Sequence, residues 1–260
     1  MIEIINDNAE IALLKIPKNS IDLTVTSPPY DNLRTYNGNN DLWSESVWKS
    51  VIEELYTVTK PGGVVVWVVG DATIKGSETG TSFKQALWAM ECGFNLHDTM
   101  IYQKAGFRFP FPNRYHQVFE YMFIWTKGKP KTFNGIIDRK NKHTNRTSPN
   151  MKRELDGSIT YRKPFTQNEF GKRFNVWKYA TGKGGSTNDV IAKKHPAIFP
   201  EKLAHDHIIS WSNEEDTVLD PFMGSGTTGK MAKQLGRNFI GIELDKDYYE
   251  IAKSRIHNTL

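Results

Sequence analysis

The sequence predicts an α/β protein whose core is a doubly wound, Rossmann-like sheet. Short apolar runs alternate along the chain with longer segments whose apolar residues recur at helical spacing, which is typical of strands connected by helices. In addition, residues 64–69 are apolar at six successive positions, as in a strand covered on both faces. We therefore expect a single domain with a mixed sheet that binds its ligands at the carboxyl ends of the strands.

Local patterns predict the individual elements in order. Segments with the length and apolar character of strands are 21–26, 64–69, 96–103, 118–126, 217–219 and 238–242. Segments with helical spacing, or with helix-ending residues after them, are 44–59, 82–91, 200–212, 227–235 and 246–257. Between residues 127 and 194 no period continues, so an irregular extension near residues 130–190 is expected at one edge of the sheet.

Composition limits the class of protein. The chain has 260 residues, of which 38% are hydrophobic and 12% aromatic, so it can form one large domain with a packed core. No apolar run is long enough to cross a bilayer, and residues 1–4 lack the basic-then-apolar start of a signal peptide. The single cysteine, Cys92, excludes an internal disulfide. We expect a cytoplasmic protein without a membrane partner.

Positive charge is concentrated in the middle of the chain. The net charge is +5, but residues 127–194 hold 17 Lys and Arg against 5 Asp and Glu, a net charge of +12 that leaves −7 for the rest. This asymmetry indicates a polyanionic partner, although a solvated, lysine-rich loop has the same composition. The residues expected to contact nucleic acid include Arg139, Lys140, Arg146, Arg162, Lys163, Lys172 and Arg173.

A glycine-rich loop at residues 220–229, between a predicted strand and a predicted helix, indicates a nucleoside site. Its glycines allow a tight turn and a close approach of the backbone to a ligand. Glu243 ends the next predicted strand, where a carboxylate can accept hydrogen bonds from both ribose hydroxyls. For the loop alone, a purely structural turn is the alternative. ATP and GTP are disfavoured because Gly229-Lys230 is followed by Met231 instead of the Ser or Thr of a P-loop.

The turn Ser27-Pro28-Pro29-Tyr30 follows the first predicted strand. Its prolines stiffen the backbone and donate no hydrogen bonds, so its carbonyls are available as acceptors. A carbonyl and the Ser27 hydroxyl together can hold an –NH₂ group and direct its nitrogen lone pair toward an electrophile. Tyr30 can stack on a base. A proline-rich structural turn with a buried tyrosine is the alternative.

In combination, residues 26–30 and residues 220–228 resemble the beta group of amino-methylating DNA methyltransferases. The resemblance implies an S-adenosylmethionine-dependent methyltransferase sheet, with S-adenosylmethionine as the cofactor and double-stranded DNA as the substrate. It implies cofactor contacts from Asp7, His195, Pro196, Asp220, Pro221, Phe222, Gly224, Ser225, Gly226, Thr227 and Glu243. Asp7 departs from the family pattern, because Asn6 stands where a glycine is usual. A helix N-cap is the alternative role for Asp7.

The order of the motifs also implies how the chain is divided. Residues 1–129 would form the catalytic half of the methyltransferase domain, residues 130–194 the target-recognition region, and residues 195–260 the cofactor-binding half of the same domain. The catalytic residues would be Ser27, Pro28, Pro29 and Tyr30, which hold a base that has been flipped out of the double helix.

The residues favour one methylation chemistry over others. Cytosine C5 methylation needs a thiolate nucleophile, and Cys92 lacks the Pro-Cys context of those enzymes, so we exclude it. Transfer to an amino nitrogen needs no covalent intermediate. Ser27 favours cytosine N4, since the family often has Asp at this position for adenine; adenine N6 is the alternative. A restriction-modification system is the expected setting, and a cognate restriction endonuclease and a homodimer are partners that no residue specifies.

Other functional classes account for fewer features. An NAD-dependent oxidoreductase has no role for the proline turn or the basic segment, and a non-catalytic nucleic-acid-binding module leaves the glycine loop unexplained. Methylation of RNA or of a protein side chain is a related variant. No metal site is predicted. His205 and His207 are the only close histidine pair, and we expect both at the surface, because helical residues two apart do not share a face.

Overall fold

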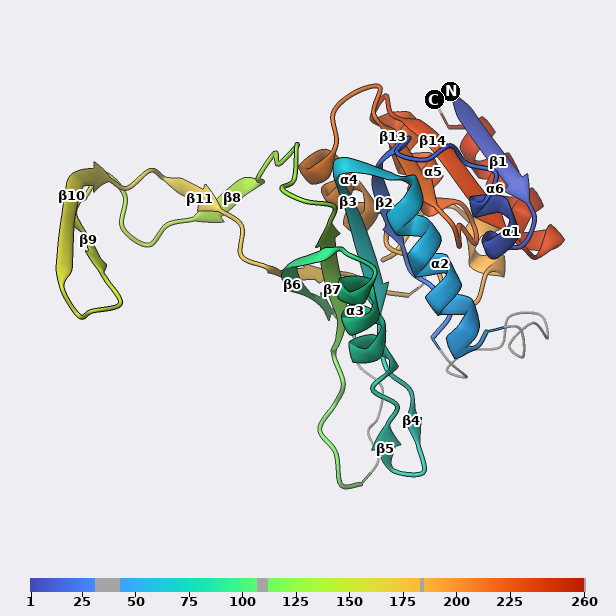
Figure 1. Ribbon diagram of the computed structural model, residues 1–260, viewed down its shortest axis with the longest axis horizontal. Coiled ribbons are helices and arrows are strands. Elements are labelled where there is room, and N and C mark those ends of the chain that lie inside the picture. The colour runs from blue at the N-terminus through green and yellow to red at the C-terminus, as the bar shows by residue number, and fades with distance from the viewer. Residues whose placement is uncertain (31–42, 107–111, 183–184, 260) are drawn as a thin grey trace. The chain divides into compact units, whose positions relative to one another are not determined.

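The computed structural model places the strand before the proline turn beside the strand before the glycine loop (Figure 1). It describes residues 1–30, 43–106, 112–182 and 185–259. The chain forms two compact units, Met1–Asn134 with Asn175–Leu260, and Gly135–Phe174.

The first unit contains an eight-stranded sheet in the order β1-β14-β13-β2-β3-β7-β6-β12. The first five strands in this order, β1, β14, β13, β2 and β3, run parallel to one another. β7 is antiparallel to both β3 and β6, and β12 is parallel to β6. The bounds are β1 Ile2–Asn6, β2 Ile21–Thr26, β3 Thr59–Val69, β6 Asn95–Lys104, β7 Phe119–Thr126, β12 Val176–Tyr179, β13 Thr217–Asp220 and β14 Asn238–Glu243. The predicted doubly wound, mixed sheet is therefore confirmed.

Helices cover both faces of this sheet. Helices α1 to α3 contact one another along the chain, and α4 to α6 form a second such row. Their bounds are α1 Ala9–Leu13, α2 Glu45–Val58, α3 Thr81–Glu91, α4 Glu201–Trp211, α5 Thr227–Gln234 and α6 Lys246–His257, with a short 3₁₀ helix at Ile191–Lys194. In β3, Val65 and Trp67 belong to the cluster beneath α1 to α3, and the alternate residues Val64 and Val66 are also buried. This explains the uninterrupted apolar run in the sequence.

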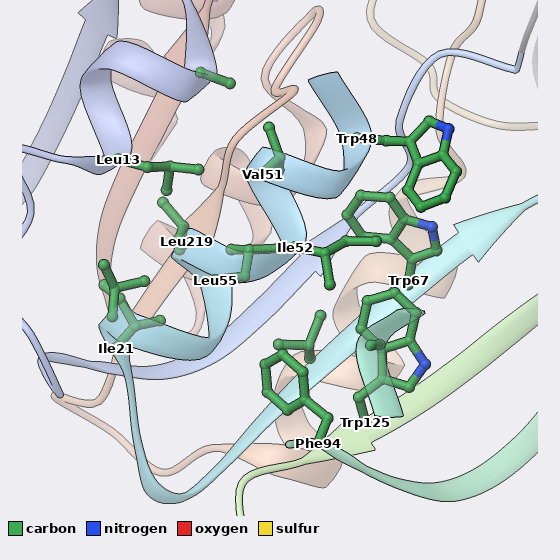
Figure 2. Close-up of a cluster of buried hydrophobic side chains, with 14 of the residues drawn as sticks. Leu13, Ile21, Trp48, Val51, Ile52, Leu55, Trp67, Phe94, Trp125 and Leu219 are labelled. Atoms are coloured by element: carbon green, nitrogen blue, oxygen red, sulfur yellow. The ribbon is translucent and has the colours of Figure 1, made fainter. Parts of the chain in front are cut away.

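The core between α2 and the sheet is shown in Figure 2. Leu55 of α2 is fully buried in it, at a position that the helical spacing predicts. Trp67 of β3 stacks on Trp125 of β7, with ring centroids 5.2 Å apart. The Trp67 indole N–H donates to the buried side chain of Gln85 at 2.9 Å, so this polar atom is satisfied inside the core.

Capping side chains begin two of the predicted helices. Ser44 precedes α2 and its hydroxyl accepts a hydrogen bond from the Val47 N–H. Asp245 precedes α6 and accepts from two N–H groups of the first turn. Both residues satisfy donors that have no partner within the helix, so they define where α2 and α6 begin.

Three strands differ clearly from the sequence analysis. β3 begins at Thr59, not at residue 64, because Thr59 already pairs with Ile21 ahead of a register shift. β1 was not predicted; its five residues lie at the edge of the sheet and pair only with β14. β12 lies in the segment expected to be irregular, and a strand of four residues is too short to give a periodic signal.

The second unit, Gly135–Phe174, consists of paired strands and not of irregular chain. β8 (Ile137–Lys140) pairs with β11 (Phe170–Lys172), and β9 (Thr147–Arg153) pairs with β10 (Ile159–Thr166), both antiparallel. The structure describes every residue of this unit, and none of its hydrophobic residues is buried. A sequence without a buried face has no hydrophobic period, so these strands could not be predicted.

The two histidines of α4 differ in environment. His205 keeps an accessible side chain, but His207 is buried, with its ring 4.5 Å from that of Trp177 and its Nε2 3.2 Å from the Met122 sulfur. The prediction that both are surface residues is therefore wrong for His207. It lies four residues after the buried Leu203 and so shares the inward face of α4. None of the helices in the described ranges is long and apolar enough for a transmembrane span.

Candidate active site

The proline turn and the glycine loop lie at the same edge of the sheet. β2 and β13 are parallel neighbours, with Thr24 opposite Leu219 in the register. At their carboxyl ends the Thr26 hydroxyl donates a buried hydrogen bond of 2.7 Å to the Asp220 carboxylate. Two segments separated by about 190 residues in sequence therefore meet where sheets of this kind bind ligands.

Asp220 holds the start of the glycine loop. The same carboxylate oxygen that accepts from Thr26 also accepts from the Phe222 N–H at 3.1 Å. Burial raises the pKa of Asp220 to about 6, against the lowering effect of these hydrogen bonds. Of the other predicted cofactor residues, Pro221 is buried, while Phe222 is partly exposed and has edge contacts to Trp43 and Trp67.

The glycines of the loop permit two close approaches. Gly224 has a φ of +51°, and a side chain there would begin 2.9 Å from Nε2 of His195. Gly226 has a φ of +79°, and a side chain there would begin 2.9 Å from the Ala252 methyl group of α6. Gly224 therefore keeps the loop close to His195, whereas Gly226 allows α5 to pack on α6.

Glu243, at the end of β14, faces the same loop. One carboxylate oxygen accepts from the Gly224 N–H at 2.8 Å, and the other accepts from the Asp245 N–H at 2.9 Å. Burial raises the pKa of Glu243 to about 7, although both hydrogen bonds favour the ionised form. A carboxylate has about four lone-pair sites, so both oxygens retain acceptor capacity toward a ligand.

Asp7 follows β1, the neighbour of β14, and its N–H donates to the Glu243 carbonyl at 3.2 Å. Its carboxylate accepts from the Lys15 ammonium at 2.8 Å and from the Asn8 N–H, which hold the pKa of Asp7 below its ordinary value. The N-cap of α1 is Asn8, whose side chain accepts from the Glu10 N–H. The alternative that Asp7 itself caps a helix is therefore wrong.

The segment before α4 brings His195 to the loop. His195 is buried, its Nδ1 accepts from the Ala197 N–H at 3.1 Å, and its ring lies 4.4 Å from that of Tyr248. Pro196 is exposed beside it. The sequence did not predict Tyr248, since its position on α6 gives no signal apart from helical spacing.

A buried guanidinium lies beneath the glycine loop. The side chain of Arg255 is only 1% exposed and donates to the hydroxyls of Ser225 and Thr227. It also forms ion pairs with Glu201 and Asp189, at 2.9 and 3.1 Å. The two loop hydroxyls therefore have a partner inside the protein, which the sequence did not predict.

The proline turn is tied to the other half of the sheet. The Ser27 hydroxyl lies 2.8 Å from the Tyr30 hydroxyl, which donates to the buried Glu120 carboxylate at 3.0 Å. Glu120 in turn pairs with Lys104 at 2.5 Å. Ser27, Pro29 and Tyr30 are partly exposed and Pro28 is buried. Sequence reasoning missed Glu120, although a lone carboxylate near the start of an apolar strand was a visible signal.

The second unit holds all the basic residues that were proposed to contact nucleic acid. Five of them are exposed: Lys140, Arg146, Arg162, Lys163 and Lys172. Arg173 is less exposed because it forms an ion pair with Asp138, and Arg139 lies over the Phe174 ring and donates to the Lys172 carbonyl. The unit has ten Lys and Arg against four Asp and Glu.

Two features bear on other chemistries. Burial raises the pKa of Cys92 to about 11, which disfavours the thiolate that cytosine C5 methylation needs. Within the described ranges, no three His, Cys, Asp or Glu residues are grouped so that they could hold a metal ion.

Comparisons with known proteins cover most of the chain. A family model described as DNA methylase, and named for N6 and N4 methylation, matches residues 21–254. The orphan methyltransferase M.BamHII of Bacillus amyloliquefaciens is 58% identical over 242 residues, which is 92% of this chain and 89% of that protein.

Two solved structures share the fold. The cytosine-N4-specific PvuII DNA methyltransferase has a TM-score of 0.72 at 20% identity, covering 98% of this chain and 86% of its own. The M1.HpyAVI–SAM complex has a TM-score of 0.62 at 23% identity and covers 98% of both chains.

Proposed function

This chain belongs to the DNA methylase family, and from that premise we propose that it transfers a methyl group from S-adenosylmethionine to the exocyclic N4 of cytosine in duplex DNA. The observation that carries the proposal is the hydrogen bond between Thr26 and Asp220, because it joins the turn that would hold the amine to the loop that would hold the methyl donor. Family membership sets aside an oxidoreductase and a non-catalytic binding module.

The residues at the end of β14 suit the nucleoside part of S-adenosylmethionine. Glu243 offers acceptors for the two ribose hydroxyls, and Gly224 leaves no side chain between the loop and His195. Asp7 is joined to Glu243 through the backbone and is an acceptor suited to an adenine amino group. When bound, the cofactor supplies an electrophilic methyl group. The protein's part is to position the cofactor and the target amine and to exclude water.

The proline turn suits an exocyclic amine. The Ser27 hydroxyl and the Pro28 carbonyl can accept both amine hydrogens, which directs the nitrogen lone pair away from them. The base has to leave the double helix to reach this site, and Tyr30 offers it a stacking face. We propose cytosine because Ser27 is neutral and stands where the family often has Asp for adenine; adenine N6 is the second candidate.

DNA binding is proposed for the second unit. Its exposed basic residues can neutralise phosphates, and counterion release then makes the affinity depend on salt. We retain the division into residues 1–129, 130–194 and 195–260 as the proposed functional boundaries. A restriction-modification setting, a cognate endonuclease and a homodimer stay predictions, and the 58%-identical relative is named an orphan methyltransferase.

The test is to incubate the purified chain with duplex DNA and deuterated S-adenosylmethionine, digest the DNA and identify the labelled nucleoside by mass spectrometry. N4-methylcytosine is the expected product. N6-methyladenine would overturn the choice of base only. Absence of any labelled nucleoside across DNA of all short sequence contexts would overturn the proposal. A Ser27→Ala, Tyr30→Ala double variant that still binds the cofactor is the matched control, and its full activity would remove the assigned role of the turn.

A further inference from the structure

A chain of polar side chains, Lys104, Glu120 and Tyr30, ends at the Ser27 hydroxyl, which would receive the target amine. The Lys104 ammonium and the Tyr30 hydroxyl both donate to the Glu120 carboxylate, and the Ser27 hydroxyl lies next to that of Tyr30. The successive distances are 2.5, 3.0 and 2.8 Å. Lys104 ends β6, Glu120 is the second residue of β7, and Ser27 follows β2. Three strands of one sheet therefore contribute to a single polar chain.

The sheet fixes the geometry of this chain. The Lys104 N–H donates to the Val118 carbonyl at 2.7 Å, which holds the ends of β6 and β7 together. At the end of β3, a side chain on Gly70 would begin 3.4 Å from Cγ of Glu120 and 3.8 Å from the Tyr30 ring. Glu120 and Tyr30 therefore both lie against the backbone at Gly70, next to the end of β3.

The proton positions follow from the charges. A tyrosine hydroxyl has one proton to donate, and the groups around that of Tyr30 include Glu120 at 3.0 Å and the Val68 carbonyl at 3.3 Å. A carboxylate only accepts, and a hydrogen bond to it is about twice as strong as one between neutral groups. Tyr30 therefore donates to Glu120, and the Ser27 hydroxyl donates to Tyr30. The Ser27 proton is occupied, and its lone pairs remain for an incoming N–H.

Resting on the function proposed above, we infer that Glu120 is a positioning residue that acts through Tyr30 to keep the Ser27 hydroxyl an acceptor toward the target amine. The direction matters because a hydroxyl, unlike a carboxylate, can also donate. A Ser27 hydroxyl that donated to the amine nitrogen would occupy the lone pair that has to attack the methyl group. The chain from Glu120 removes this unproductive orientation, so a neutral serine can serve where an aspartate would only accept.

The variant Glu120→Gln tests the direction of the chain with almost no change in shape. With Lys104 beside it, the amide oxygen would face the ammonium and the –NH₂ group would face Tyr30. The amide would then donate to Tyr30, Tyr30 to Ser27, and Ser27 to the amine. We expect the single-turnover methylation rate to fall roughly tenfold or more, while the Kd for DNA and the thermal shift caused by S-adenosylmethionine stay near those of the wild type.

Two further variants separate this role from a structural one. In Glu120→Gln with Lys104→Met, the amide is free to turn its oxygen toward Tyr30, and we expect the rate to recover in part. A merely structural role predicts that any recovery of the rate follows a recovery of the melting temperature, because the double variant also removes the unpaired lysine charge; the positioning role predicts recovery of the rate at an equal melting temperature. Asp22→Asn is the matched control, since Asp22 also pairs with a lysine, at 2.6 Å, with side-chain exposure of 11% against 10% for Glu120, but at the opposite end of β2. It should keep the wild-type rate.

The outcomes are distinct. A wild-type protein that methylates no DNA would refute the proposed function. A wild-type protein that methylates DNA, with a Glu120→Gln variant of equal rate, would overturn the role of Glu120 alone. A Glu120→Gln variant that loses cofactor binding or melts well below Asp22→Asn, with a rate that changes only in step with the melting temperature in the Lys104→Met background, would show that Glu120 only stabilises the fold.

Discussion

The raised pKa of Glu243 predicts that cofactor affinity depends on pH near neutrality. With a pKa of about 7, Glu243 is about half protonated at pH 7 in the ligand-free protein. Protonation removes acceptor capacity that the ribose hydroxyls would use, so the ionised form is the competent one. Apparent affinity is reduced by the fraction of competent protein. Between pH 8.5 and pH 6.5 the ionised fraction falls about fourfold, so Kd should rise about fourfold, or about 0.8 kcal/mol.

The measurement is isothermal titration of S-adenosylmethionine at half-unit steps over that range, which stays above the pKa of about 6 of Asp220. Glu243→Gln cannot titrate, so its Kd should be flat with pH and, at pH 8.5, weaker by roughly 1–3 kcal/mol because the charged acceptor is gone. Asp7→Asn is the control. Hydrogen bonding from Lys15 lowers the pKa of Asp7, which therefore stays ionised throughout, and the Asn variant should retain the wild-type pH slope. Equal slopes in the wild type and in Glu243→Gln would refute the reasoning.

Three other perturbations have defined outcomes. Gly224→Ala should weaken S-adenosylmethionine binding at least tenfold in the same titration, because of its positive φ and the 2.9 Å approach to His195, whereas Gly76→Ala, with a positive φ in open space, should not. Arg255→Met should lower the free energy of unfolding in urea by about 3–5 kcal/mol, since it leaves Glu201 and Asp189 short of a buried partner; a decrease below about 1 kcal/mol would contradict this. Replacing Arg146, Arg162 and Lys163 by Gln should reduce the slope of log affinity for DNA against log salt by about 1 for each phosphate that is no longer neutralised, and an unchanged slope would place DNA binding elsewhere.

The sequence was most informative where local chemistry determines structure. Helix α6 has the predicted bounds, and Asp245 caps its first turn. Strand β2 also has its predicted bounds, because its apolar run ends at the proline turn. Glu243 was found at the end of its strand for the same local reason. These features need only a few neighbouring residues, so a single sequence can reveal them.

Contacts between distant segments could not be predicted in the same way. Glu120 meets Tyr30 across 90 positions and Arg255 meets Asp189 across 66, and neither pair has a motif. His207 was assigned to the surface from its spacing to His205 alone, without regard to its place on the same face as Leu203. Such residues become visible only when the sheet order brings the segments together.

The chain from Gly135 to Phe174 enters and leaves the first unit at anchored points. Before the segment, the Asn134 backbone N–H donates to the Ser210 carbonyl. After it, the Asn175 side chain donates a hydrogen bond to the Asp98 carboxylate, and the Asn175 carbonyl accepts from the Ile101 N–H. Between Trp125 and Trp177, a stretch that the structure describes throughout, the chain contributes no hydrophobic residue to the buried core. Substitutions in the inserted segment are therefore not constrained by packing of the hydrophobic core. The segment Gly135–Phe174 can vary without changing the residues that form the core. A library of variants confined to this segment would therefore sample new binding properties at little risk to folding.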